Sequence, residues 1–213
     1  VVVNADIKAL TPKAIGTDGK SSQQTILGTV VGYLHSSETS VATISNVTVS
    51  GNIKTIGRVG GIVGGVADGV IKNCTNRANI EVNFSEAYSV NNYGEAGGIA
   101  CWVRHYTPVD STIPFTAGVT EGATTNVYKV LFENCKNEGN IKNNIADAVG
   151  ILGRALAANT QLLEFRNCVN TGTLETTVSK HYTATMLGRF SHRPNTDVFI
   201  TFTGCENIYV MLP

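Results

Sequence analysis

Charged residues are scarce in this chain, and the two signs are balanced. They make up 15% of the 213 residues, and 16 Lys and Arg stand against 16 Asp and Glu. Surfaces that bind nucleic acid normally carry an excess of positive charge, so we expect no nucleic-acid partner. No stretch approaches the roughly 20 apolar residues that a membrane-spanning helix needs. We therefore expect no membrane span, and a secretion signal would lie outside these residues.

Cysteine and proline are also infrequent, with 5 residues of each in the chain. So few cysteines do not suggest a disulfide scaffold at this length, and neither Cys-x-x-Cys nor His-Glu-x-x-His occurs. The nucleophile motif Gly-x-Ser-x-Gly is missing as well. We therefore expect no metal site, no cofactor and no nucleophilic triad.

Glycine, by contrast, is frequent at 22 residues, and Thr, Asn and Val are abundant. Val and Thr favour strands, whereas Asn and Gly favour tight turns. Long helical periodicity is missing. This composition predicts an all-β protein of many short strands.

Two short motifs alternate along the chain. The first reads Phe/Ile-x-Asn-Cys-x-Asn-x-Gly-x-Ile and occurs at residues 71–80, 132–141 and 165–174, with degenerate copies at 44–53 and 202–207. The second is Gly-Gly-Ile-Val-Gly or a variant of it, at residues 28–32, 60–64, 97–101, 149–153 and 184–188. Five alternations indicate a repeat architecture.

The spacing of the first motif predicts which repeat architecture this is. Its cysteine position is occupied by residues that lie 27, 61, 33 and 37 positions apart, namely Val47, Cys74, Cys135, Cys168 and Cys205. A solenoid coil of three short strands and three turns has about this length, whereas propeller blades need about 40–50 residues. We interpret residues 106–128, rich in Thr, Pro and Gly, as a loop inserted into one coil. The predicted fold is a single-stranded parallel β-helix (β-solenoid) of about five coils, in one domain over residues 1–213.

Stacking the copies predicts columns of equivalent residues. One interior column contains Ile44, Ile71, Phe132, Phe165 and Phe202. The cysteine position forms a second interior column, in which we expect free buried thiols that pack as small apolar groups. The Asn before it is expected to turn a corner with unusual backbone angles and to bond its amide to the next coil. Gly51, Gly139 and Gly172 are expected at positive φ.

These motifs resemble a known family. Gly-Ile-Val-Gly and Gly-Ile-Leu-Gly segments followed by Asn-Cys-x-Asn-x-Gly-x-Ile look like the GLUG-type repeats of bacterial surface proteins, which are common in gut Bacteroidetes. The resemblance covers roughly residues 26 to 207. It implies a secreted or cell-surface, adhesin-like protein on the bacterial outer surface, with no catalytic residues to transfer.

A candidate binding strip follows from the second motif. Its copies place five residues in one column, namely Tyr33, Gly65, Trp102, Arg154 and Arg189. Arginines do not face a dry core without partners, so we expect this column to face outward, with Arg104, His105 and Tyr106 enriching the same edge. Aromatic rings beside arginines suit sugar rings or an acidic chain. The alternative is that Trp102 holds the inserted loop and that the arginines are ordinary solvated residues.

Strand alternation leaves one neighbouring column undecided. If Tyr33 and Trp102 face outward, strict alternation also turns outward Val31, Val63, Ala100, Leu152 and Leu187. Such an apolar stripe would mark a docking surface. A kink at the intervening residue would instead turn the stripe inward.

Three functions are compatible with the sequence. The leading hypothesis is an adhesin-like domain that presents a binding face to a glycan or to a host or bacterial surface protein. The second is a structural spacer, for which the column from Tyr33 to Arg189 would be covered or featureless. A polysaccharide-processing enzyme is the third, with His181, Tyr182, Arg189, His192 and Arg193 as its best cluster. We expect no enzyme, because the aspartates are scattered and fall mostly in turns.

The beginning of the sequence matches the middle of a repeat. Residues 1–8 align with residues 47–54, so the first coil starts at the cysteine position. We expect that the native protein extends towards its N-terminus, into another domain or more coils. The alternative is that Val1 simply follows a cleaved leader.

Overall fold

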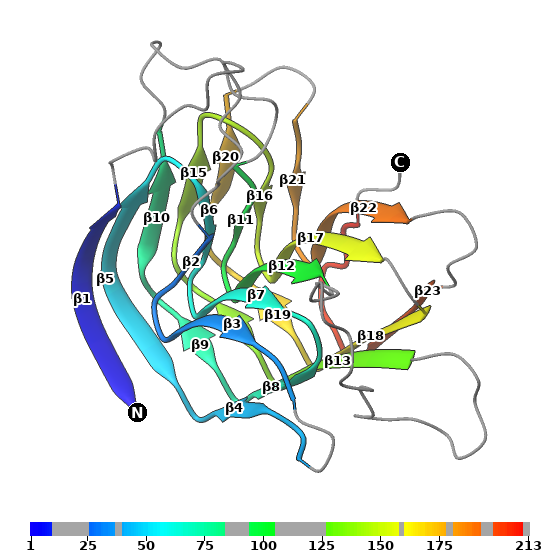
Figure 1. Ribbon diagram of the computed structural model, residues 1–213. Coiled ribbons are helices and arrows are strands. Elements are labelled where there is room, and N and C mark those ends of the chain that lie inside the picture. Colours follow the sequence, from blue (N-terminus) through cyan, green and yellow to red (C-terminus); the bar gives the residue numbers. More distant parts are fainter. Residues whose placement is uncertain are drawn as a thin grey trace, which may run out of the picture.

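The computed structural model describes residues 1–9, 26–36, 40–83, 94–104, 127–157, 160–177, 181–192 and 198–210. Within these ranges the secondary structure is entirely β, and every strand pairing is parallel (Figure 1). In the described part no helix is long and apolar enough to cross a membrane. His105 and Tyr106 of the expected strip lie outside the described residues.

The strands form four sheets. Sheet A contains β1 (Val2–Ala9), β5 (Thr48–Thr55), β9 (Thr75–Asn76), β10 (Asn79–Val82), β14 (Lys136–Asn137), β15 (Ile141–Asn143), β19 (Val169–Asn170) and β20 (Leu174–Thr176). Sheet B contains β2 (Ile26–Gly28), β6 (Arg58–Gly60), β11 (Ala96–Gly97), β16 (Ala148–Val149) and β21 (Thr183–Ala184). Sheet C contains β3 (Val31–Leu34), β7 (Val63–Val66), β12 (Ala100–Arg104), β17 (Leu152–Ala157) and β22 (Leu187–His192). Sheet D contains β4 (Thr43–Ser45), β8 (Gly69–Lys72), β13 (Val127–Glu133), β18 (Thr160–Arg166) and β23 (Val198–Thr203).

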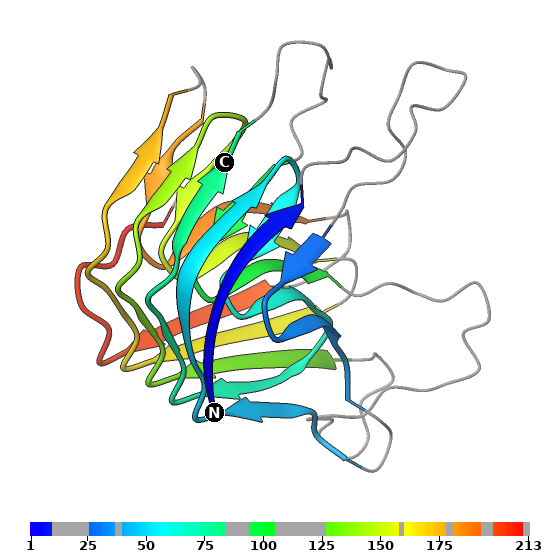
Figure 2. The same cartoon turned by 90° about the vertical axis from the view of Figure 1, so that its left-hand side faces the viewer.

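Each coil runs through the four sheets in the order A, B, C, D, and consecutive coils stack in register (Figure 2). This arrangement confirms the predicted parallel β-solenoid. The expectation of three strands per coil is wrong, because the Gly-Gly-Ile-Val-Gly motif bends the chain between sheets B and C and adds a fourth side. Of the insertion expected at residues 106–128, residues 106–126 lie outside the described ranges, and the last two residues belong to strand β13.

The fourth side gives the coil an L-shaped cross-section. Sheets A and B face each other in one arm, and sheets C and D face each other in the other (Figure 1). The outer faces of sheets B and C therefore enclose an angle, which we call the inner corner.

The interior columns are those that the repeat spacing predicted. Phe132 pairs with Ile71 on one side and with Phe165 on the other. The Phe132 and Phe165 rings stack at 5.1 Å between centroids, and the Phe165 and Phe202 rings at 5.0 Å. The cysteines are free, and all are buried except Cys205, which is half-buried.

The asparagines before the cysteine position turn the outer corner between sheets D and A. Asn46, Asn73, Asn134 and Asn167 have φ of 57°, 53°, 51° and 50°. The amide nitrogens of Asn73, Asn134 and Asn167 each donate to the amide oxygen of the asparagine in the preceding coil, at 2.9 Å between Asn134 and Asn73. Asn accepts this left-handed backbone more readily than other non-glycine residues, so the expectation is confirmed.

The glycines of the first motif follow this expectation only in part. Gly51 has φ of 105°, whereas Gly139 and Gly172 are not at positive φ, so the prediction is wrong for these two. Close packing explains them instead. A Cβ on Gly139 would lie 2.0 Å from the backbone oxygen of Ala78 in the preceding coil.

The second asparagine of the motif forms a buried amide column. The Asn137 Nδ2 donates to Asn170 Oδ1 at 2.7 Å and to the backbone oxygen of Gly139 at 2.9 Å. Its Oδ1 accepts from Asn76 Nδ2 at 2.7 Å. Glycine is required opposite this column, because a Cβ on Gly98 would lie 2.4 Å from the Asn137 amide.

The first strand continues the stack as the sequence alignment predicted. Strand β1 pairs with β5 from Val2 opposite Thr48 to Ala9 opposite Thr55. The apolar side chains Val3 and Ile7 pack against the main core.

Candidate functional site: the inner corner

In the first three coils the bend at the inner corner contains a glycine that lets two strands approach closely, whereas Val149 and Ala184 occupy this position in the last two coils. A Cβ on Gly60 would lie 1.8 Å from the backbone oxygen of Val63, and one on Gly97 would lie 1.9 Å from that of Ala100. The backbone between these residues bonds to the next coil, for example from Ile62 N to Ile99 O at 3.1 Å. The Gly-Gly-Ile-Val-Gly motif is therefore a bend that each coil repeats.

A kink that the strands of sheet C share resolves the undecided apolar stripe. Val63 and Val66 both belong to the hydrophobic core, although strict alternation would place residues three apart on opposite faces. The ladder between β7 and β12 skips the pair Gly64 and Cys101. Of the stripe, Val63, Ala100, Leu152 and Leu187 are fully buried. Of the two alternatives that the sequence left open, the kink is therefore the correct one, and these four residues form no apolar docking stripe.

The column predicted from the second motif is assembled in register, but it is not an open strip. Trp102 pairs with Gly65 and Arg154, and Arg154 pairs with Arg189. Exposure is 39% for Tyr33 and 3% for Trp102. The side chain of Arg154 is 14% exposed and that of Arg189 is 30% exposed. The expectation of an accessible strip is thus wrong for Trp102 and Arg154, because the inner corner shields them. Arg104 ends strand β12.

A second column, from sheet B, lines the other wall of the inner corner. Strand pairing and backbone hydrogen bonds align Ile26, Arg58, Glu95, Asp147 and Tyr182. Sequence reasoning missed Arg58 and Glu95. The signal was available, since Arg58, Glu95 and Asp147 each lie two residues before the start of a copy of the second motif.

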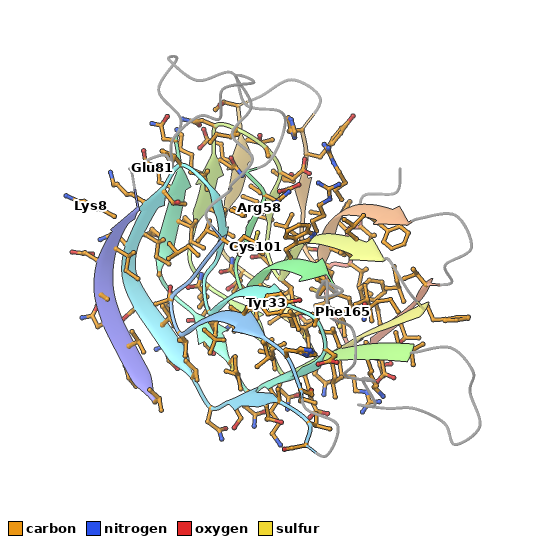
Figure 3. The ribbon with its side chains drawn as sticks, in the orientation of Figure 1. Lys8, Tyr33, Arg58, Glu81, Cys101 and Phe165 are labelled. Atoms are coloured by element: carbon orange, nitrogen blue, oxygen red, sulfur yellow. The ribbon has the colours of Figure 1, made fainter. Side chains whose placement is uncertain are left out.

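Glu95 joins the two walls electrostatically. Its Oε2 lies 2.7 Å from Arg58 Nε, and its Oε1 lies 2.8 Å from Arg154 Nη1. Burial raises the pKa of Glu95, but the two guanidinium groups outweigh it and hold this pKa below its ordinary value. The Arg58 guanidinium also lies over the Trp102 ring, 4.0 Å from the centroid. Figure 3 shows Arg58 and Cys101 inside the angle between the sheets.

Asp147 forms a second charged group, in the last two coils. This buried carboxylate accepts from Tyr182 N at 3.1 Å and lies 3.1 Å from His181 Nδ1, both through Oδ1. Its Oδ2 lies 3.5 Å from Arg189 Nε. His181 is nearly buried, whereas Tyr182 is 55% exposed. The structure thus brings together three residues that the sequence had placed in the best enzyme cluster, and adds Asp147 to them.

Cys101, the cysteine of this corner, is a buried thiol rather than a reactive thiolate. The Cys101 thiol is fully buried and donates to the backbone oxygen of Glu95 at 3.1 Å. Burial, and the negative charge of Glu95, raise the pKa of this thiol. Among the described residues no group of three or more His, Cys, Asp and Glu is arranged to hold a metal ion.

Comparison with known proteins supports the repeat. A family model, the GLUG motif, matches residues 56–81. The match spans one coil and contains one copy of each motif, which supports a GLUG-type repeat in this chain. No curated protein and no solved structure matches the chain.

Proposed function

We propose that this chain is a secreted or cell-surface, adhesin-like repeat domain of a bacterium, and that it binds a glycan at the C-terminal end of the inner corner. A match to a GLUG-type repeat supports the adhesin-like role. The rigid stack of coils supports it further, since a solenoid presents side chains of successive coils at a fixed spacing of about 4.8 Å.

The main support for the proposed site is the position of Arg189. Arg189 is partly open to solvent, while Asp147 and His181 hold it from beneath. A guanidinium group that is fixed in this way loses little conformational freedom when a ligand binds. Tyr182 follows Asp147 in the sheet B column and exposes its ring to solvent. An aromatic ring and a fixed arginine together suit a sugar that carries an acidic group.

The charges of the inner corner favour the same ligand. Its described side chains include three arginines (Arg58, Arg154 and Arg189) against two carboxylates (Glu95 and Asp147). The excess of positive charge attracts an acidic group to Arg189, the most exposed of the three. The proposed partner is therefore an acidic glycan, free or attached to a host or bacterial surface protein.

A glycan array with matched variants tests this function. We expect saturable binding to acidic glycans that Arg189→Gln and Tyr182→Ala each weaken. Arg166→Gln, on the outer face of sheet D, is the control, because it removes an exposed arginine away from the corner. If well-folded protein binds no glycan, or if all three variants behave alike, the proposed site is wrong.

A structural spacer is the second candidate, and one observation favours it. Most of the column that the sequence singled out is covered, since Trp102 and Arg154 are occupied in packing and ion pairs within the corner. A folded protein that binds no glycan would support this role. The expectation that the chain is not an enzyme remains a prediction.

A further inference from the structure

The outer face of sheet A is a second polar surface, remote from the inner corner in the fold. A shallow depression of about 300 Å³ runs across β5, β10, β15 and β20. Two columns of side chains line it. The outer polar column contains Asn52, Asn79, Asn140 and Thr173, and the charged column contains Lys54, Glu81, Lys142 and Glu175. Figure 3 shows Glu81 on this outer side, with Lys8 of β1 beyond it.

From β5 to β20 the charged column alternates in sign from coil to coil, and Lys8 of β1 lies beside Lys54 at its end. Lys54 Nζ lies 2.9 Å from Glu81 Oε2, and Lys142 Nζ lies 3.1 Å from Glu175 Oε1. These four side chains neutralise one another. A polymer with charge of one sign would meet repulsion at every second coil, whereas an uncharged polymer would meet none.

The outer polar column offers one hydrogen-bonding side chain per coil, at the same spacing as the charged column. Asn140 Oδ1 accepts from the backbone nitrogen and the hydroxyl group of Thr173, at 3.1 and 2.7 Å. Within the described part of the chain its Nδ2 has no such partner and is open to a ligand. Asn79 Nδ2 makes only a long bond of 3.4 Å to Asn52 Oδ1. Amide groups of this kind suit hydroxyl groups, which both donate and accept.

We propose that this face binds an uncharged, extended polysaccharide that lies across the strands, along the axis of the solenoid. The four strands span about 15 Å at the ordinary interstrand spacing, so the ligand contacts several sugar units at once. Each contact is weak, and the repeat of the coils adds them together. This site goes beyond the proposed function, because it uses a different sheet and a ligand without charge.

Biolayer interferometry on immobilised polysaccharides tests the proposal. The probes are dextran, galactomannan and arabinoxylan as neutral polymers, polygalacturonate as a polyanion and chitosan as a polycation. In the Arg189→Gln variant, which lacks the proposed acidic-glycan site of the inner corner, we expect at least one neutral polymer to bind more tightly than both charged ones. Asn140→Asp keeps the oxygen that Thr173 uses and removes the free donor, so it weakens this binding by about 3- to 10-fold. Asn134→Asp adds the same negative charge at the outer corner, where the amide nitrogen bonds to Asn73 and not to a ligand, and leaves the affinity unaltered.

A charge reversal tests the selectivity separately. In the Arg189→Gln background, Glu81→Lys completes a run of four cations with Lys8, Lys54 and Lys142, so binding to polygalacturonate appears. Glu206→Lys, at an exposed position away from this face, does not produce it. The proposal is overturned if no neutral polymer binds, if Asn140→Asp has no effect, or if the Arg189→Gln variant prefers a charged polymer. Arg189→Gln leaves binding to neutral polymers unchanged, which separates this site from the inner corner.

Discussion

Replacing Asn137 with alanine tests whether the buried amide column stabilises the solenoid. Asn137 is fully buried, and its side chain makes three hydrogen bonds, to Asn76, Gly139 and Asn170. A buried hydrogen bond contributes about 0.5–1.5 kcal/mol net, and the partners left unpaired add a cost of desolvation. We therefore expect Asn137→Ala to lower the free energy of unfolding by about 3 kcal/mol.

Asn170→Ala is the matched control in the same column. Asn170 is only half-buried, and its side chain makes two bonds, to Asn137 and to the backbone oxygen of Gly172. Its loss should cost about 1–2 kcal/mol, because water can replace part of the bonding. The two variants share the loss of the bond between Asn137 and Asn170 and differ in the burial of the residue replaced.

Urea unfolding measures both variants. The single tryptophan, Trp102, is buried and reports by fluorescence, while circular dichroism reports on the strands. Coincidence of the two signals establishes a single transition, which the calculation of a free energy requires. Equal costs for the two variants, or a cost below about 1 kcal/mol for Asn137→Ala, would refute the role given to the column.

Two further predictions concern buried carboxyl groups. Burial raises the pKa of Asp68 above its ordinary value of 3.8, although bonds from Ser36 and the nearby His35 offset part of the effect. The folded chain then binds a proton more readily than the unfolded chain, so stability is lost as the pH rises from 3.8 through the raised pKa. Asp68→Asn should raise the melting temperature at pH 7 and leave it nearly unchanged at pH 3; a fall at pH 7 would contradict this. Glu95→Gln leaves Arg58 and Arg154 without their shared carboxylate and should cost about 3–5 kcal/mol in urea unfolding, and a neutral result would contradict the importance of this ion pair.

Much of the architecture was predictable because in-register stacking repeats one position at every coil. The spacing of the two motifs alone placed Phe132 against Phe165 and Trp102 against Arg154. The positive φ of the corner asparagines also followed from residue type, since Asn tolerates that backbone. Family comparison added support for the repeat over residues 56–81.

The candidate site was less predictable, because it depends on an angle between two sheets. The sequence indicated that Arg154 and Arg189 face outward, but the inner corner then covers Arg154 and Trp102. Alternation failed at Gly64 and Cys101, where a kink shared by both strands places two successive residues on the outer side. Glu95, which pairs with Arg154, and Arg58, which pairs with Glu95, lie beside sheet C on another sheet. Their separation from Arg154 along the chain does not show that they are close to it in space.

The sequence by itself determined the parallel solenoid, its register and its buried columns, since these follow from the period of the repeat and the size of each side chain. Only the tertiary structure decided that each coil has four sides and that sheets B and C meet in a concave corner. The reason is that a Gly-Gly bend sets the direction of the chain through close backbone contacts, such as that of Gly60 with Val63, which composition does not encode. Burial of Trp102 and the pairing of Arg58, Glu95 and Arg154 follow from that direction.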